Sequence, residues 1–125
     1  LERGSEIPRI MSFNKQWPKL KQLEFTTFRY PRVDNDWYVG EQVQVFYKAR
    51  SKDRQRLGEA AIIGKEHREL ERFFARDDRP LVTDAEAIAD GFESREDMAN
   101  YLEKLYGLDY ISLFHKLTLR WLKTI

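Results

Sequence analysis

Hydrophobic and polar residues alternate in three segments of the first half of the chain, as in β-strands with one buried face. Residues 24–30 are rich in β-branched and aromatic side chains, residues 42–48 alternate most regularly, and residues 57–64 follow as a third such segment. The intervening residues 49–56 are almost all polar and include four Lys or Arg. We therefore predict three strands, the last two of which form a hairpin with a long basic tip.

Helix signals appear in the second half of the chain. Thr83 and Glu86 have the spacing of a capping box, which predicts a short helix over residues 85–90. Gly91 follows directly and is the expected left-handed stop of this helix.

A second helix is predicted after Ser94, which with Asp97 repeats the capping pattern. Its apolar residues recur at helical spacing before Gly107: Met98, Tyr101, Leu102 and Leu105. Residues 110–122 alternate again in their second half, which predicts a long strand that closes the sheet.

Two segments have mixed patterns. Residues 10–23 combine large apolar side chains with lysines around Pro18, which favours a short helix or an irregular segment over a strand. Residues 66–74 are rich in helix formers, so we predict a helix there, with continuation of the preceding strand as the alternative.

The elements together predict an α+β domain, a small and mostly antiparallel β-barrel with two or three short helices. A chain of 125 residues supports one hydrophobic core, so residues 10–125 are expected to form a single domain. Residues 1–9 are expected to be a disordered or cloning-derived N-terminal segment.

Composition excludes several kinds of site. The chain has no cysteine, which rules out disulfides and zinc–thiolate sites, and only His67 and His115 remain as imidazole ligands. We therefore expect neither a metal nor a cofactor. No apolar run approaches the roughly 20 residues that span a bilayer. We therefore expect a cytoplasmic protein that does not associate with membranes.

The net charge of +1 conceals a segregation of charge along the chain. Residues 15–56 hold ten Lys or Arg and five Asp or Glu, residues 57–112 hold seven and fourteen, and residues 113–125 hold three and none. If the two basic segments meet in space, the domain has a basic side and an acidic side, and such a surface attracts anionic ligands.

Four local sequences resemble the ASCH domain, a family of the PUA-like superfamily. The family signature Gly-x-Lys-x-x-Thr-x-Arg is similar to residues 22–29, in which Thr27 and Arg29 take the last two fixed positions. Residues 40–45 resemble the Gly-Asp-x-Val-x-Val strand of the family, and residues 90–102 resemble its helix that begins near "dGF". A closing strand like residues 110–121 follows.

The resemblance implies a PUA-like β-barrel with a cleft around the signature strand that binds RNA or a nucleotide-like ligand. The expected binding residues are the signature pair and nearby cations or rings: Lys21, Thr27, Arg29, Arg32, Tyr47, Lys48, Lys116 and Arg120. Cations at these positions would neutralise phosphates, and rings would stack on bases. We expect a binding domain rather than an enzyme.

Two alternatives remain. Some relatives look like amidohydrolases that act on acetylated cytidine with a lysine and a threonine of the signature, but Glu24 takes the lysine position here. A carboxylate differs from an amine in charge and reach. If the chain is an enzyme, the candidate catalytic residues are therefore Thr27, Glu24 as a general base, and Lys21 as the substitute amine. The second alternative is a protein-interaction module. An apolar surface patch without basic residues at its rim would favour this alternative.

Overall fold

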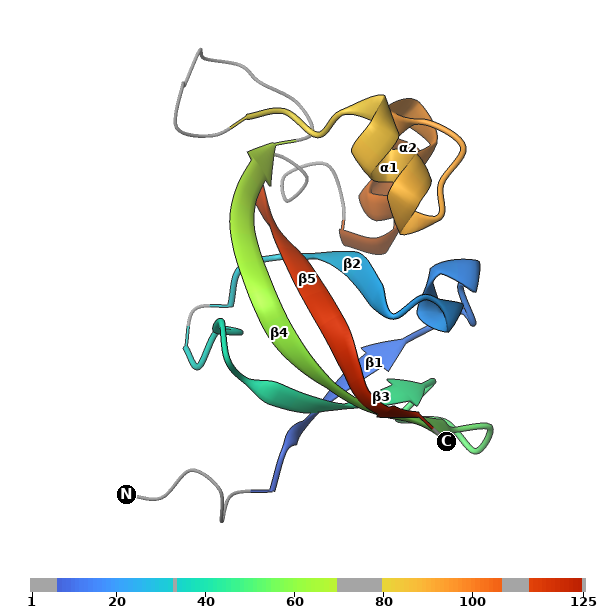
Figure 1. Cartoon of the computed structure of the whole chain (residues 1–125). Helices are drawn as coiled ribbons and strands as arrows, with labels where there is room; N and C mark the ends of the chain where they lie inside the picture. The colour runs from blue at the N-terminus through green and yellow to red at the C-terminus, as the bar shows by residue number, and fades with distance from the viewer. Residues whose placement is uncertain (1–6, 33, 70–79, 107–112, 125) are drawn as a thin grey trace.

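A curved five-stranded sheet with two α-helices on its outer side forms the described part of the chain (Figure 1). The computed structural model describes residues 7–32, 34–69, 80–106 and 113–124. In chain order the elements are β1 (Arg9–Phe13), the 3₁₀-helix η2 (Pro18–Lys21), β2 (Glu24–Arg29), β3 (Gln42–Tyr47), β4 (Gln55–Glu69), α1 (Asp84–Asp90), α2 (Arg95–Tyr106) and β5 (Leu113–Thr124).

The sheet is mixed, with strand order β1-β3-β4-β5-β2. β1 pairs with β3 in parallel, and the other three neighbouring pairs are antiparallel. In the part of the chain that the structure describes, no strand ladder joins the edge strands β1 and β2, so the sheet is not a closed barrel. We call the gap between these edges the seam; Arg29 Nη2 crosses it and donates to the Ser12 carbonyl at 3.0 Å.

Both faces of the sheet are covered on the side of β2 and β5. The concave face encloses the larger core, with Met11, Val43, Val45, Ile62, Leu117 and Leu119 among its fully buried residues. The convex face packs Phe28 of β2 and Phe114 of β5 against the two helices through Ala87, Phe92, Met98 and Leu102. The domain therefore has two cores, and β2 contributes to both because its alternate side chains point to opposite faces.

The predicted helix caps are confirmed. The Glu86 amide donates to Thr83 Oγ1 at 3.1 Å, and the Thr83 amide donates to Glu86 Oε1 at 3.1 Å, which completes the capping box of α1. Gly91 ends the helix in a left-handed conformation with φ of 113°. In α2, Ser94 Oγ accepts from the Asp97 amide at 3.0 Å, and Met98 and Leu102 are buried, but Leu105 of the predicted stripe is half-exposed.

The predicted hairpin is confirmed, but the prediction for residues 10–23 is wrong at its start. β3 and β4 are antiparallel neighbours, and residues 48–54 form the tip between them. Residues 9–13 are a strand paired in register with residues 43–47. Met11 and Phe13 alternate with exposed Ile10, but the lysines and Pro18 that follow obscure this short period-two pattern. The strand starts one residue before the predicted domain boundary.

The helix predicted from residue 66 is also wrong where the structure describes it. β4 continues to Glu69, and His67 and Glu69 pair in register with His115 and Leu113 of β5. Cross-strand pairing over this length outweighs the helix propensity of the segment. Residues 70–74 of the predicted helix, and the predicted stop at Gly107, lie outside the described residues.

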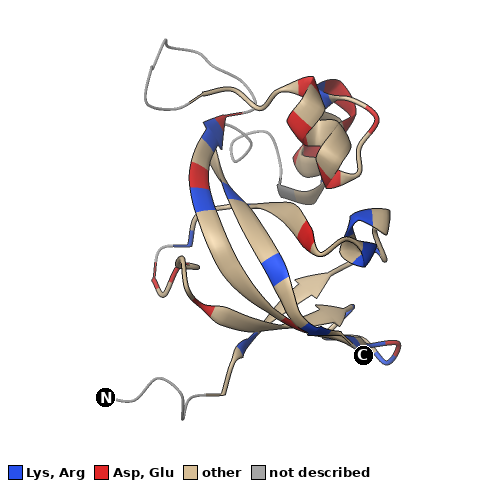
Figure 2. Cartoon of the chain, viewed as in Figure 1, with Lys and Arg blue, Asp and Glu red and all other residues tan. Residues whose placement is uncertain are grey.

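Charge is distributed over the fold much as the segments suggested. In Figure 2, Asp and Glu positions gather on α1 and α2, whereas Lys and Arg positions gather on η2 and the hairpin tip. The two basic segments also touch: the Trp121 amide donates to the Leu23 carbonyl at 3.0 Å, and Trp121 Nε1 donates to the Leu20 carbonyl at 3.0 Å. Across the described ranges, no helix is both long and apolar enough to cross a bilayer.

Candidate ligand-binding site

A cavity of about 210 Å³ lies at the seam, between the end of β1, β2 and the helices. Five rings form one part of its wall: Phe13, Trp17, Phe28, Phe92 and Tyr101. Four side chains able to donate or accept protons form another part: Lys19, Thr27, Arg29 and Asp90. A concave site with rings and a few convergent polar groups is the usual form of a small-ligand pocket.

Lys19 and Asp90 form a buried ion pair in this cavity. Lys19 Nζ donates to Asp90 Oδ1 at 2.9 Å, and the side chains are 4% and 5% exposed. Lys19 comes from η2, where Pro18 at the first position starts the turn, and Asp90 is the last residue of α1. Thr26 Oγ1 donates to the same Oδ1 at 2.9 Å.

Burial outweighs pairing for both charges. It lowers the pKa of Lys19 below the ordinary value, against the opposing effect of Asp90. It raises the pKa of Asp90, against the opposing effects of Lys19 and Thr26. Each group is thus displaced toward its neutral form, and desolvation of such pairs often costs more than their attraction returns. Buried groups whose pKa values are displaced in this way are candidates for a functional site.

Thr27 and Arg29 lie beside this pair on β2. Arg29 Nε donates to Thr27 Oγ1 at 3.1 Å, and the guanidinium carbon stands 4.8 Å from the centre of the Phe13 ring. Thr27 is only 5% exposed. Because the arginine occupies an acceptor position of the hydroxyl, the hydroxyl proton of Thr27 is directed elsewhere.

The ring wall is closely packed and held in place by polar contacts at its edge. The Trp17 and Phe92 ring centres are 5.1 Å apart, and those of Phe92 and Tyr101 are 5.3 Å apart. Tyr101 Oη donates to Asn14 Oδ1 at 2.8 Å, which ties α2 to the segment after β1. A Cβ at Gly91 would lie 2.8 Å from Trp17 Cε3, so glycine at the helix stop also makes room for the indole.

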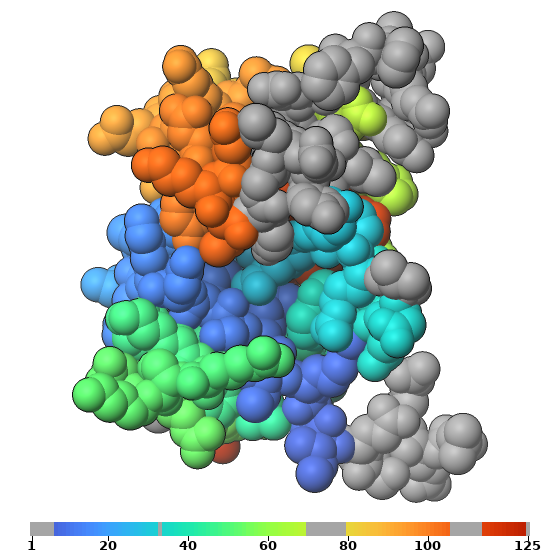
Figure 3. All heavy atoms as spheres, turned by 180° about the vertical axis from the view of Figure 1, so that it is seen from behind, coloured from blue at the N-terminus to red at the C-terminus, as the bar shows by residue number. Residues whose placement is uncertain are grey.

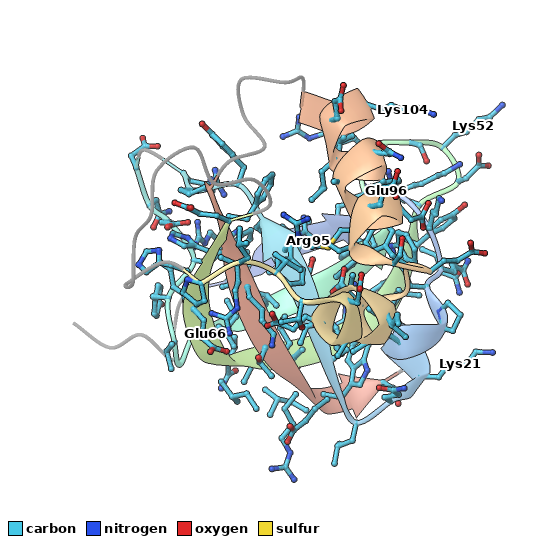
Figure 4. The ribbon with its side chains drawn as sticks, turned by 90° about the horizontal axis from the view of Figure 1, so that it is seen from above. Lys21, Lys52, Glu66, Arg95, Glu96 and Lys104 are labelled. Carbon is cyan, nitrogen blue, oxygen red and sulfur yellow. The ribbon has the colours of Figure 1, made fainter. Side chains whose placement is uncertain are left out.

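Of the residues selected from the sequence, only Thr27 and Arg29 line this cavity. Lys21 is exposed on η2 and points away from the body of the domain (Figure 4). It borders a separate open groove together with Trp121 and Lys123. The Lys21–Thr27 contact that the hydrolase alternative required is therefore not formed.

The other selected residues are dispersed over the surface. Glu24 is exposed and faces Arg120, also exposed, in the β2–β5 register. Lys116 Nζ donates to Glu86 Oε2 at 2.8 Å on the helix-covered face. Arg32 lies over Trp37, and Lys48 lies over Tyr47 at the start of the hairpin tip. The eight expected binding residues therefore do not form one cleft.

The sequence prediction missed Asp90 and did not single out Lys19 or Trp17 as cavity residues. One local signal was available for Asp90. A carboxylate in the last turn of a helix is unfavourable because it interacts repulsively with the helix dipole. Residues that break such a local rule are often found at functional sites. Lys19 carried no equivalent signal because it was one of several lysines in its segment.

The described ranges also expose several large apolar side chains, which is the feature that the protein-interaction alternative depends on. Leu23 and Leu122, 58% and 52% exposed, are the members of this set that line one open groove of about 820 Å³. Lys21 and Lys123 border the same groove, so its rim is basic.

Comparison of the chain with models of known protein families, with curated proteins and with solved structures finds no match. The geometry of the cavity therefore carries the functional argument.

Proposed function

We propose that this chain binds a nucleotide-like ligand, with the base inside the cavity and the sugar and phosphate toward the seam. The observation that carries the proposal is the buried Lys19–Asp90 pair set against a wall of aromatic rings. A fold retains such a pair at a cost in stability, which supports a role in ligand binding.

The size of the cavity supports a single base. At about 210 Å³ it lies below the roughly 300–1,000 Å³ typical of pockets for drug-sized ligands. A planar ring system fits such a space when it stacks on aromatic side chains, as unpaired bases do in RNA-binding proteins. The sugar and phosphate of the ligand would then remain outside the cavity.

The polar groups suit the edge of a base. Asp90 accepts both of its side-chain hydrogen bonds from the described residues at Oδ1, so Oδ2 receives none from them and is an acceptor for an exocyclic amino group. The hydroxyl of Thr27 supplies a donor. Arg29, which reaches across the seam, supports a negative charge at its opening.

We further propose that the domain is an ASCH-like member of the PUA-like superfamily. The sheet curved around the larger core, the signature residues on β2 and the α1–Gly91–α2 order are the observations that support an ASCH-like, PUA-like assignment. A cytoplasmic location, where nucleotides and RNA are abundant, belongs to the same proposal.

A two-dimensional NMR titration with the four ribonucleoside monophosphates at low salt tests the proposal. We expect shifts concentrated at Trp17, Thr27 and neighbouring amides, and loss of binding in Arg29→Ala. Arg120→Ala is the matched control, because Arg120 is exposed on β5 and does not line the cavity. Shifts that are absent, or that Arg29→Ala leaves unchanged, would refute the proposal.

One observation favours a second candidate function, hydrolysis of an acylated base. The amine that Lys21 does not supply is present in the cavity as Lys19, together with Thr27 and Asp90. In this reaction water adds to the acyl carbon, the C–N bond breaks, the acyl group leaves as a carboxylate and the base recovers its amino group. Because the pKa of Lys19 is lowered, more of it is the free amine at neutral pH, and the free amine is the form that can accept a proton from the attacking water.

Chromatography of N-acylated nucleosides incubated with the protein tests this candidate. Turnover that Lys19→Met and Thr27→Val both abolish, while Lys21→Met leaves it unchanged, would support hydrolysis. Binding without turnover would leave the ligand-binding function alone.

A further inference from the structure

The tip of the β3–β4 hairpin, residues 48–54, carries an unusual density of positive charge. It holds four cations and one carboxylate: Lys48, Arg50, Lys52, Arg54 and Asp53. In the described ranges no carboxylate forms an ion pair with any of these four cations, whereas Arg9, Lys65, Arg68 and Lys116 are each paired. Within the described ranges, the charge of the tip is therefore not neutralised by ion pairs.

The tip is attached to the wall of the cavity through β1. The Lys48 amide donates to the Phe13 carbonyl at 2.8 Å, and the Ala49 amide donates to Ser12 Oγ at 3.0 Å. Ser12 and Phe13 both line the cavity, and the Ser12 carbonyl accepts from Arg29. Two amides of the tip thus bond to the same short segment that borders the cavity and receives Arg29.

An open groove lies beside the tip and shares one lining residue with the cavity. It is lined by Ile10, Ser12, Lys48, Ala49, Arg50 and Ser51, so Ser12 belongs to both hollows. From behind, Figure 3 shows the hairpin tip in green directly below the N-terminal segment in blue, with α2 in orange above it. The order on this face is α2, the N-terminal segment and the tip.

Lys48, the first residue of the tip, has an unusual backbone conformation. Its φ is 47°, a left-handed conformation that glycine or asparagine adopts more easily than lysine. Its ammonium lies 5.4 Å from the centre of the Tyr47 ring. Lys48 therefore holds a less common backbone conformation at the point where the tip begins.

We propose that the hairpin tip is a second binding site, which takes the phosphates of a single-stranded nucleic acid whose base occupies the cavity. This inference rests on the proposed function. One base enters the cavity, the sugar–phosphate chain leaves past Ser12 and Arg29, and the following phosphates lie along Lys48, Arg50 and the rest of the tip. A single strand fits this path because its bases are free to turn into a cavity, as those of a duplex are not.

A second open groove beside the cavity is the competing path. It shares Trp17 with the cavity and contains two cations, Lys21 and Lys123, among mostly apolar residues. Figure 4 shows Lys21 and Lys52 pointing outward from the domain. The tip has the greater density of unneutralised charge and is bonded to the cavity wall, which favours it.

Anisotropy titrations over a range of salt concentrations test the inference. The probes are a labelled mononucleotide and a labelled eight-nucleotide strand, the latter as RNA, as DNA and as an RNA duplex. We expect a single strand to bind more tightly than the mononucleotide and the duplex. Each phosphate contact contributes a slope of about 0.7 in log Kd against log salt for single strands.

Two double variants that remove the same charge separate the paths. Lys48→Gln with Arg50→Gln should lower the salt slope of the strand by about 1.4 and leave mononucleotide binding unchanged. Lys21→Gln with Lys123→Gln should leave both unchanged. An equal effect of both variants, no effect of the tip variant, or duplex binding as tight as that of either single strand would overturn the inference.

The outcomes also separate this inference from the proposed function. If the mononucleotide binds at the cavity but the strand binds no tighter, the second site fails and the cavity assignment stands. If neither the mononucleotide nor the strand binds, both fail. If the strand binds and Arg29→Ala does not weaken it, the link between the tip and the cavity is refuted.

Discussion

Two ion-pair clusters in this domain contain similar groups but differ in the balance of forces. In the cavity, Asp90 faces one lysine and one threonine hydroxyl. At the interface between α1 and the sheet, Glu86 accepts from Lys116 at 2.8 Å, from Arg68 at 3.0 Å and from the Thr83 amide at 3.1 Å. Both carboxylates belong to α1, at opposite ends of the helix.

The pKa shifts of the two carboxylates have opposite signs. For Asp90, burial raises the pKa and the two donors do not reverse this. For Glu86, burial also acts to raise the pKa, but hydrogen bonds from Lys116, Thr83 and Arg68 outweigh it, and the pKa falls below the ordinary value. Glu86 is also less deeply buried, at 15% exposure against 5%.

The difference shows which cluster stabilises the fold. A carboxylate with several donors on both oxygens is well compensated for its lost hydration, so the Glu86 cluster joins α1 to β4 and β5. The Asp90 pair has fewer donors and deeper burial, so its lost hydration is less well compensated, and the proposed ligand-binding function rests on this difference. Pairing alone therefore does not identify a stabilising contact; the number of donors and the depth of burial decide.

The largest expected effect comes from breaking the cavity pair on one side. Asp90→Leu leaves the Lys19 ammonium buried without its partner, and we expect a loss of about 3–5 kcal/mol in the free energy of unfolding. Lys19→Met combined with Asp90→Leu should recover this loss and reach or exceed the wild-type value, while ligand binding is abolished. Urea denaturation measures both. A double variant as unstable as the single one would show that the pair stabilises the fold.

A smaller loss is expected at the residue that follows Asp90. Gly91→Ala places a Cβ against Trp17 Cε3 at 2.8 Å and forces alanine to a φ of 113°, which we expect to cost about 2 kcal/mol or more. Gly40→Ala is the control, because Gly40 also has a positive φ, 96°, but no atom lies within 4 Å of its added Cβ. The excess of the first loss over the second reports the contact with Trp17, and only Gly91→Ala should also weaken ligand binding.

A substitution in the Glu86 cluster should lower the free energy of unfolding without changing the affinity for the ligand. Glu86→Gln keeps the shape of the side chain but removes its charge, and we expect a loss of about 1–2 kcal/mol from weaker bonds to Lys116, Arg68 and Thr83. Ligand affinity should stay within the error of the NMR titration. A change in affinity comparable to that of Arg29→Ala would refute the separation of the two clusters.

The smallest effects are the pH dependences, which should have opposite signs. Because the folded-state pKa of Glu86 is lowered, its stabilisation is present above the ordinary value of 4.5 and lost as pH falls through the folded value. Because that of Asp90 is raised, its contribution is greatest below the ordinary value of 3.8 and declines as pH rises through the folded value. Denaturation of wild type, Glu86→Gln and Asp90→Asn between about pH 3 and pH 7 measures both contributions.

On acidification, the advantage of wild type over Glu86→Gln should shrink, and that of wild type over Asp90→Asn should grow. If both differences in the free energy of unfolding changed with pH in the same direction, the opposite pKa shifts of Glu86 and Asp90 would be contradicted.

The sequence by itself determined the features that depend on close neighbours. The capping box of Thr83 and Glu86, the left-handed stop at Gly91 and the β3–β4 hairpin with its basic tip were all predicted. These features depend on hydrogen bonds between residues a few positions apart and on the periodicity of apolar side chains. Both can be recognised directly in the sequence. The pairing of Thr27 with Arg29 at the cavity was within reach for the same reason, because the two lie two positions apart on one strand.

Only the tertiary structure decided which distant residues meet. Lys19 and Asp90 are separated by 71 positions, and their contact depends on where α1 docks on the sheet. The parallel pairing of β1 with β3 and the continuation of β4 to Glu69 also depend on partners far along the chain, which outweighed local propensity. A local pattern states what a residue prefers, whereas the register of the sheet and the packing of the helices determine what it touches.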